Sequence, residues 1–258
     1  MLRRTAISLL LGVPRIPEPE RGCAVLLDIQ TRKLLYSNQQ VPDSMAGPPG
    51  SSIKPLTLAA LLRSGKLQPR EKFVCSGQVL IGGRRMDCSH PRMGTALDIE
   101  TALAYSCNSF VSQAATRFGP GDLSRALTDF TARPVGGERQ QLQAIGEEAV
   151  VATPVAMANA FRRLALRQAE ARLRPVFGGL ESAVEYGTAQ LARVAWAQVA
   201  GKTGTTRAGG QPLAWFAGYA PAAQPKVVVA VMISGRHGAT DAAPVAAQIL
   251  QAWHEGKL

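Results

Sequence analysis

The C-terminal third of the chain contains apolar runs separated by turn-forming residues. Residues 199–206, 214–219 and 227–233 are three such runs, with glycine or proline between them, and this pattern is typical of buried strands. Residues 23–29 form a further apolar run near the N-terminus, and residues 33–37 follow after a short turn. Connections this short favour antiparallel pairing. We therefore expect an antiparallel sheet of about five strands.

The middle of the chain has helical periodicity and helix start signals. Asp98 and Thr153 stand where N-caps are expected, and Pro154 suits a first helical position. The expected helices span about residues 52–63, 97–105, 109–118, 120–130, 153–166 and 180–190, with a closing helix at 242–254. The sequence thus predicts an α+β fold, in which helices flank the sheet and a mostly helical subdomain is inserted at about residues 50–190.

Composition narrows the class of protein. The 258 residues are 46% hydrophobic and 18% charged, which is ordinary for a globular protein with one large domain or two interlocked subdomains. The formal net charge of +11 would suit an anionic partner. However, the arginines are scattered and aromatic residues make up only 5%, so we expect no nucleic-acid partner. Apolar runs after the N-terminus are too short to predict a membrane span.

Residues 1–21 form an N-terminal tail. They begin with Met-Leu-Arg-Arg, continue with a short apolar stretch and become rich in proline. This order resembles a secretory signal, although no small-residue cleavage site follows. We predict an exported protein, with a signal, a short anchor and a disordered tail as the three interpretations of this segment.

Two cysteines, Cys75 and Cys88, bracket a turn-rich stretch at residues 66–97. In an exported protein a disulfide between them would tie down a loop with little core of its own, and the alternative is a pair of reduced thiols. With His90 they could also bind a metal ion, but their spacing fits no zinc pattern. We therefore expect no metal site and keep the disulfide as a prediction.

A stiff Pro-Pro-Gly turn leads directly into the first helix, and Ser51 or Ser52 is expected to cap that helix. Ser51 and Lys54 are three positions apart, so they share one face at its positive end. A serine becomes a nucleophile when a base takes its proton, and burial at a helix N-terminus lowers a lysine pKa. Alone, this pattern also fits a capping serine beside a solvated lysine.

Two later stretches change that interpretation. Residues 106–108, Ser-Cys-Asn, interrupt a helix with two short polar side chains, which by itself is a capping turn. Residues 201–206, Gly-Lys-Thr-Gly-Thr-Thr, place a lysine and several hydroxyls along a strand whose glycines allow close approach. By itself this strand fits a phosphate-binding edge or an ordinary strand.

Taken in order, Ser-x-x-Lys, Ser-x-Asn and Lys-Thr-Gly resemble the active-site signature of penicillin-binding proteins and serine β-lactamases. Further stretches are similar to penicillin-binding transpeptidase domains, namely residues 102–108, 185–189, 214–219 and 242–246. The resemblance covers roughly residues 22–255. It implies a β-lactamase/transpeptidase-like fold, with residues 22–258 as the catalytic domain.

The resemblance also implies a role for each matched residue. Ser51 would be the acylated nucleophile and Lys54 its proton acceptor. Ser106 would relay a proton, Lys202 would orient Ser106, and Asn108 would hydrogen-bond the substrate amide. The substrate carboxylate would bind at Thr203, Gly204 and Thr205 on the Lys-Thr-Gly strand. The backbone N–H groups of Ser51 and Thr205 would form the oxyanion hole.

The implied reaction is acyl transfer from a D-Ala-D-Ala stem peptide of peptidoglycan. An amine acceptor would give a crosslink and make the protein a D,D-transpeptidase, whereas water would make it a D,D-carboxypeptidase. A serine β-lactamase would need a water-activating carboxylate, for which Glu147 and Glu148 are candidates. A non-catalytic scaffold that binds β-lactams or muropeptides is the alternative outside enzymes.

The resemblance further implies where the protein acts and with what. Its site would lie on the extracytoplasmic, periplasmic face of the inner membrane, and it would need no cofactor. The expected partners are stem peptides, β-lactams as covalent inhibitors, and a glycosyltransferase. Residues 130–153 and 167–179 look short for this family, so we expect reduced walls around the substrate groove.

Overall fold

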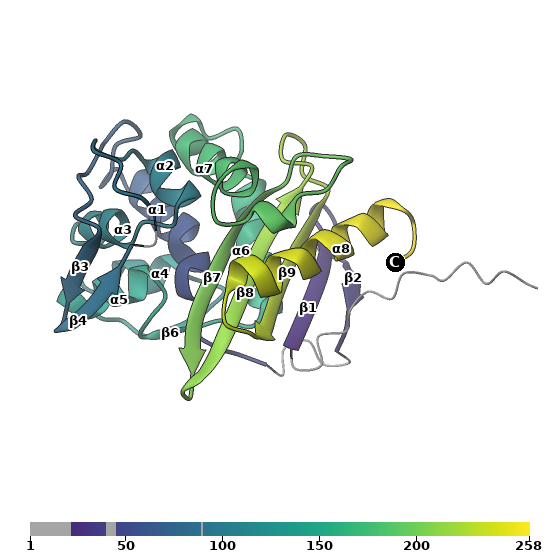
Figure 1. The fold of residues 1–258 in the computed structure, drawn as a ribbon, viewed down its shortest axis with the longest axis horizontal. Coiled ribbons are helices and arrows are strands. Elements are labelled where there is room, and N and C mark those ends of the chain that lie inside the picture. The colour runs from purple at the N-terminus through teal and green to yellow at the C-terminus, as the bar shows by residue number, and fades with distance from the viewer. Residues whose placement is uncertain (1–21, 40–44, 89) are drawn as a thin grey trace, which may run out of the picture.

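The structure is a computed structural model that describes residues 22–39, 45–88 and 90–258. A five-stranded antiparallel sheet in the order β2-β1-β9-β8-β7 forms its centre, and helices flank it (Figure 1). The α+β fold predicted from the sequence is therefore confirmed. The strands of this sheet are β1 (Gly22–Asp28), β2 (Leu34–Ser37), β7 (Ala200–Ala208), β8 (Gln211–Ala220) and β9 (Val227–Ser234).

The central strands are apolar throughout because both faces of the sheet are covered. Val25 of β1 and Trp215 of β8 belong to a core shared with the helical subdomain. The next residues along, Leu26 and Phe216, point to the other face and pack under the C-terminal helix α8 (Ala243–His254). This alternation gives the sheet two separate cores, one on each face.

Most of the helical subdomain lies beside the β7 end of the sheet, whereas its helix α6 (Pro154–Ala165) packs against the face formed by β1, β8 and β9 (Figure 1). Its helices are α1 (Lys54–Arg63), α2 (Ile99–Ala104), α3 (Asn108–Ala115), α4 (Asp122–Ala126), α5 (Gly137–Ala144), α6 (Pro154–Ala165) and α7 (Arg174–Glu185). Two small two-stranded sheets accompany them, β3 (Gln78–Ile81) with β4 (Arg84–Asp87) and β5 (Thr131–Ala132) with β6 (Val150–Val151). The short helical turns are η2 (Gly50–Ile53), η3 (Ala171–Leu173), η4 (Gln190–Ala192) and η5 (Gly238–Ala242).

Two of the predicted helix caps are present. The Asp98 side chain accepts a hydrogen bond from the Thr101 N–H at 2.9 Å and starts α2. The Thr153 hydroxyl accepts from the Ala156 N–H at 3.1 Å and starts α6. Both side chains satisfy donors that a helix N-terminus leaves without an intrahelical partner.

The predicted cap of the first helix is wrong. Ser51 and Ser52 lie inside the 3₁₀ turn η2, and α1 begins only at Lys54, with Ile53 in the N-cap position and no side-chain cap. The Ser52 hydroxyl instead donates to the Pro49 carbonyl at 2.7 Å. The Ser52 hydroxyl therefore stabilises the η2 turn and does not cap α1.

Other boundaries also differ from the sequence prediction. The helix expected at 180–190 is α7, which starts and ends earlier, and the one expected at 120–130 is the much shorter α4. The β3–β4 hairpin and α5 were not predicted. In α5 the buried Gln140 and Gln143 donate to the Phe118 carbonyl at 3.0 Å and the Arg133 carbonyl at 2.9 Å, so polar residues fill positions where a hydrophobic pattern would be sought.

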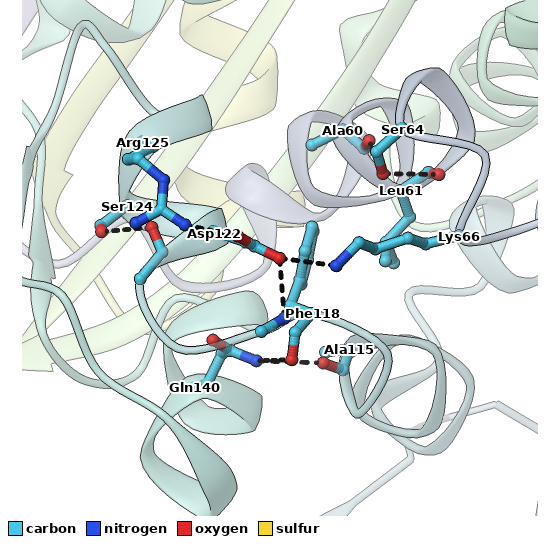
Figure 2. Close-up of polar contacts among 12 residues, drawn as sticks. Ala60, Leu61, Ser64, Lys66, Ala115, Phe118, Asp122, Ser124, Arg125 and Gln140 are labelled. Atoms are coloured by element: carbon cyan, nitrogen blue, oxygen red, sulfur yellow. Dashed lines mark hydrogen bonds and ion pairs between the residues drawn. The ribbon is translucent and has the colours of Figure 1, made fainter.

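Polar contacts tie α4 to its neighbours on the outer side of the helical subdomain. Figure 2 shows the Asp122 carboxylate between the Lys66 ammonium, at 2.6 Å, and the Arg125 guanidinium, at 2.5 Å. These groups lower the pKa of Asp122 to about 2, with the Lys66 hydrogen bond as the largest cause. The same view shows the Gln140 amide donating to the carbonyls of Ala115, the last residue of α3, and of Phe118 just after it, and these bonds hold α5 against α3.

Among the helices of the described ranges, none combines the length and apolarity that crossing a bilayer requires. The predicted signal or anchor at residues 1–21 lies outside the described residues. The division of the chain at residue 22 therefore stays a prediction.

Candidate active site

The turn that carries Ser51 packs directly against strand β7. A Cβ on Gly204 would lie 2.5 Å from the Pro49 carbonyl oxygen, and one on Gly50 would lie 2.8 Å from the Thr205 carbonyl oxygen. Gly50 also has φ +52°, a conformation that side chains rarely adopt. Glycine at both positions thus allows two backbones to meet where the candidate nucleophile and the Lys-Thr-Gly strand come together.

Lys54 lies at the centre of the polar contacts in this site. Its Nζ donates to the Asn108 Oδ1 at 2.6 Å, to the Ser106 carbonyl at 2.7 Å and to the Ser106 Oγ at 3.3 Å. The Lys54 side chain is fully buried. The first and second motifs predicted from the sequence are therefore joined through one lysine, with the half-buried Ser51 one turn before it.

Burial is the main influence on the charge of Lys54. It lowers the lysine pKa to about 8, while nearby thiols and the Glu147 carboxylate act in the opposite direction. A lysine of this pKa is partly neutral near physiological pH, so it can accept a proton from a hydroxyl. Burial thus gives Lys54 the acid–base property expected of a general base.

The Ser-Cys-Asn turn is held in an unusual conformation. Ser106 has φ +60°, which is uncommon for a residue with a side chain. Asn108 begins α3, and its Nδ2 donates to the Asp87 carbonyl at 2.8 Å while its Oδ1 accepts from Lys54. Both ends of the Asn108 amide are therefore fixed by hydrogen bonds.

Lys202 reaches the same site from strand β7. It is fully buried, and its Nζ donates to the Thr203 carbonyl at 3.2 Å. Desolvation lowers the pKa of Lys202 well below its ordinary value, and the charge of Lys54 lowers it further. The two lysines are thus close enough to influence each other's protonation.

The Thr203 and Thr205 side chains lie on the face of β7 opposite to Lys202, because strand side chains alternate. The Thr203 hydroxyl makes a hydrogen bond with the Thr188 hydroxyl at 3.1 Å. The exposed Thr205 accepts from the Gly238 N–H at 3.0 Å. Since β7 is the edge strand of the sheet, its outer backbone groups face this site rather than another strand.

Thr188 and Gly238 adjoin the site but were not assigned a place in it from the sequence, whereas Glu147 was named there only as a candidate water-activating carboxylate. Glu147 follows Gly146, whose carbonyl accepts from the Gly50 N–H at 3.0 Å, and it forms an ion pair with Arg84 at 3.4 Å. Desolvation raises the pKa of Glu147, and the charge of Lys54 counters that shift. The sequence marked Glu147 as a candidate carboxylate, but only the fold shows how near it lies to Lys54.

The cysteines gather beside the same turn. The Cys75 and Cys88 sulfurs lie 3.6 Å apart and are not bonded to each other in the structure. Cys107, between Ser106 and Asn108, lies 3.8 Å from Cys88. A hydrogen bond from Cys107 lowers the pKa of Cys88 to about 5 and raises that of Cys107. The disulfide between Cys75 and Cys88 stays a prediction.

Comparison with protein families gives one match over most of the chain. The sequence profile described as "Penicillin binding protein transpeptidase domain" matches residues 22–251. The comparison with curated proteins finds no match.

Solved structures share the fold at low identity. Penicillin-binding protein 2 of Pseudomonas aeruginosa is 20% identical, with a TM-score of 0.80 over 93% of this chain and 73% of that chain. A peptidoglycan glycosyltransferase from Burkholderia ambifaria is 19% identical, with a TM-score of 0.81 over 93% and 90%. A structure described as a peptidoglycan synthase complex that coordinates polymerization and crosslinking is 21% identical, with a TM-score of 0.76 over 90% of this chain and 56% of that chain.

Proposed function

Because the chain belongs to the penicillin-binding protein transpeptidase domain family, we propose that it is a serine-type D,D-transpeptidase that crosslinks peptidoglycan stem peptides. The observation that carries this proposal is the environment of Lys54. A buried lysine with a pKa of about 8 lies one helical turn after Ser51 and contacts both polar residues of the Ser-x-Asn motif. Such a group can take a proton from one hydroxyl and pass it on through another.

In the proposed first step, the neutral Lys54 amine takes the Ser51 hydroxyl proton as Ser51 Oγ attacks the penultimate carbonyl of the stem peptide. The tetrahedral oxyanion is stabilised by the backbone N–H groups of Ser51 and Thr205. The close packing of Gly50 against Thr205 supports this pairing, since it brings the two backbones into contact.

Collapse of this intermediate breaks the peptide bond, and D-alanine leaves with a proton delivered through Ser106. The 3.3 Å contact between the Lys54 Nζ and the Ser106 Oγ supports this route. Lys202 keeps Ser106 oriented from β7, and Asn108 orients the substrate amide. The acyl-enzyme then transfers its acyl group to an amine of a second stem peptide, and Ser51 regains its proton.

The substrate carboxylate binds at the hydroxyls of Thr203 and Thr205, beside Gly204, at the free edge of β7. Thr205 is exposed and already accepts from Gly238 N–H, so its own O–H is available to donate to an anion. This supports selectivity for peptides with a free C-terminus.

Glu147 favours a hydrolytic activity as the second candidate function. Its raised pKa and its electrostatic contact with Lys54 are the properties expected of a carboxyl group that activates water. If water reaches the acyl-enzyme through Glu147, the same residues would act as a D,D-carboxypeptidase or a serine β-lactamase. The lifetime of the acyl-enzyme distinguishes these activities from crosslinking.

The family also supports a location and a set of partners. Peptidoglycan is the substrate of the family, so the proposed site acts on the extracytoplasmic side of the inner membrane. β-Lactams, which imitate the D-Ala-D-Ala end, would acylate Ser51. A glycosyltransferase is the proposed protein partner, because crosslinking follows polymerization on the same material.

Labelling with a fluorescent penicillin tests the proposal. The purified chain should form one covalent adduct that persists for hours, located at Ser51 by peptide mass spectrometry, and Ser51→Ala should form none. Ser124→Ala, which changes a serine on α4, is the matched control and should label normally. An adduct that decays within minutes would favour hydrolysis, and Glu147→Gln should then lengthen its life. A folded chain without any adduct would contradict both activities and support a binding scaffold.

A further inference from the structure

Four potential metal ligands meet next to the Ser-Cys-Asn turn although they come from separate segments. Cys75 precedes β3, Cys88 and His90 follow β4, and Cys107 is the N-cap residue of α3. Their ligand atoms all lie within 4.8 Å of one another. We call these four residues the Cys₃His cluster.

The distances within the Cys₃His cluster match those around a tetrahedral metal ion. Zinc–sulfur bonds of about 2.3 Å place two tetrahedral sulfur ligands about 3.8 Å apart. The Cys75 and Cys88 sulfurs are 3.6 Å apart, and the Cys88 and Cys107 sulfurs are 3.8 Å apart. The sulfurs thus already have the spacing that a shared ion requires.

The His90 ring has one nitrogen engaged and one available. Its Nδ1 lies 2.7 Å from the Pro91 carbonyl oxygen, so Nδ1–H is the donor and the proton is assigned to that nitrogen. Its Nε2 is buried and has no hydrogen-bond partner in the described part of the chain. Histidines that bind metals commonly donate their second N–H to a carbonyl in this way, which leaves a lone pair on the other nitrogen.

Each sulfur of the cluster also accepts a backbone N–H. Cys75 accepts from Gly77 at 3.3 Å, Cys88 accepts from the Ser109 N–H at 3.5 Å, and Cys107 accepts from the Phe110 N–H at 3.3 Å. Such donors stabilise the thiolate form, which is the form that binds metal. Backbone N–H donors of this kind would stabilise neutral thiols much less than thiolates.

We propose that the Cys₃His cluster is a structural zinc site with four protein ligands: Cys75, Cys88, Cys107 and His90. Three thiolates and one imidazole match the tetrahedral sulfur and nitrogen sets that zinc occupies in structural sites. Binding releases the three thiol protons to solvent and involves no change of oxidation state. This proposal replaces the expectation of no metal, which rested on the spacing of only three of these residues.

The proposed zinc would stabilise the geometry of the candidate active site. It would join the end of β4 to the start of α3, where the Asp87 carbonyl already accepts from Asn108. Cys107 lies between Ser106 and Asn108, so fixing its sulfur restrains the turn in which Ser106 has φ +60°. The zinc proposal itself does not rest on the proposed function, because its tests measure metal binding.

A disulfide between Cys75 and Cys88 would exclude the zinc, since it consumes two of the four ligands. The two states therefore give opposite results in one experiment. The chain is purified under reducing conditions without chelator, and its zinc content is measured by elemental analysis. The metal-free chain is then titrated with cobalt(II), whose visible and thiolate charge-transfer absorption reports tetrahedral sulfur ligands.

We expect about one zinc per chain and the absorption of a tetrahedral sulfur-rich site. Cys107→Ser and His90→Ala should each bind zinc at least about 100-fold more weakly, because even changes outside the ligand set cost 10- to 100-fold. Cys23→Ala, which removes the one cysteine outside the cluster, should keep full zinc content. Zinc addition should also raise the Tm of the metal-free wild type but not that of His90→Ala.

Three results would overturn the proposal. One is a reduced, folded chain that takes up neither zinc nor cobalt. Another is zinc content that the His90→Ala and Cys107→Ser variants retain in full while remaining folded by circular dichroism. The third is an intact mass that shows a Cys75–Cys88 disulfide after purification without oxidant, with no zinc bound.

Discussion

At the scale of single residues, the candidate site is dominated by two buried lysines. Lys54 and Lys202 are both fully buried, and the charge of Lys54 is among the causes that lower the pKa of Lys202. Two ammonium groups in one poorly hydrated site repel each other, so the site favours states in which at most one carries a proton. Lys54, with three acceptors around it, is the better place for that proton.

The pH dependence of acylation follows from this. Below its pKa of about 8 the Lys54 amine is protonated and cannot accept the Ser51 proton, so the acylation rate should fall about tenfold for each further pH unit. Above pH 8 the rate should level off. Stopped-flow acylation by a chromogenic cephalosporin, measured from roughly pH 6 to 10, checks this.

Lys54→Arg is the control for that profile. It keeps a cation that does not titrate in this range, so the residual rate should be about 10²- to 10⁴-fold lower and should lose the step near pH 8. A wild-type rate that is flat from pH 6 to 10 would contradict the assignment of Lys54 as the base.

Residues of the candidate site were predictable to the extent that their motifs are local. Ser51 and Lys54 form a motif of four residues, and Ser106 with Asn108 one of three, so the sequence could place each pair before the fold was known. The Cys₃His cluster was missed because its sequence gaps follow no zinc pattern and because its fourth ligand, Cys107, belongs to a separate segment of the chain. Its close approach to Cys88 depends on how α3 packs against the β3–β4 hairpin.

At the scale of elements, the contact between η2 and β7 decides whether the site can form. The two backbones approach at Gly50 and Gly204, and this leaves no room for a side chain. The strand and the turn belong to distant parts of the sequence. Their contact therefore depends on both glycines at once.

Substitution of Gly204 by alanine tests that contact. The new Cβ would lie 2.5 Å from the Pro49 carbonyl oxygen and 3.1 Å from the Ser52 nitrogen, so strand and turn must separate. We expect Gly204→Ala to lower the acylation rate at least about tenfold, because displacements of this size at a reacting centre are costly. Arg207→Ala, at an exposed position of the same strand, should leave the rate within about twofold. Normal acylation by a folded Gly204→Ala would show that the close approach is dispensable.

Helices and strands could be predicted from the sequence where their buried side chains are apolar, but not where those side chains are polar. The strands β1 and β7–β9 and the capped helices α2 and α6 gave clear patterns. Helix α5 gave none, since its buried glutamines are satisfied by carbonyls of other segments. Helix α7 ends before Gly187, where a Cβ would lie 2.2 Å from the Ala104 carbonyl oxygen, a constraint set by α2 and invisible in the local sequence.

At the scale of the whole molecule, the two hydrophobic cores of the sheet differ in their relation to the candidate site. The core that includes Trp215 and Ile53 lies between the sheet and the helical subdomain and adjoins the candidate site. The core that includes Phe216 and Ile249 lies between the sheet and α8. Damage to the second core should therefore affect stability more than chemistry.

Ile249→Ala is the test of this separation. Ile249 is fully buried in α8, so its truncation should lower the free energy of unfolding by about 2–5 kcal/mol. The acylation rate of the molecules that remain folded should change less than about twofold. Urea unfolding and penicillin labelling of the same samples give both values. A loss of acylation larger than the loss of folded protein would show that α8 also positions the site.

The strand order has a consequence for how the protein is made. β1, at the start of the described chain, pairs on one side with β9, which reaches Ser234. Until Ser234 has left the ribosome, the strand that lies between β1 and β8 is missing. The edge strand β7, which carries Lys202, then belongs to an incomplete sheet. Because such distant pairings close late, a chain interrupted in synthesis would hold Ser51 and Lys54 without a finished groove. The candidate site is therefore complete only after β9 has been made, when residues 22–226 have already been translated.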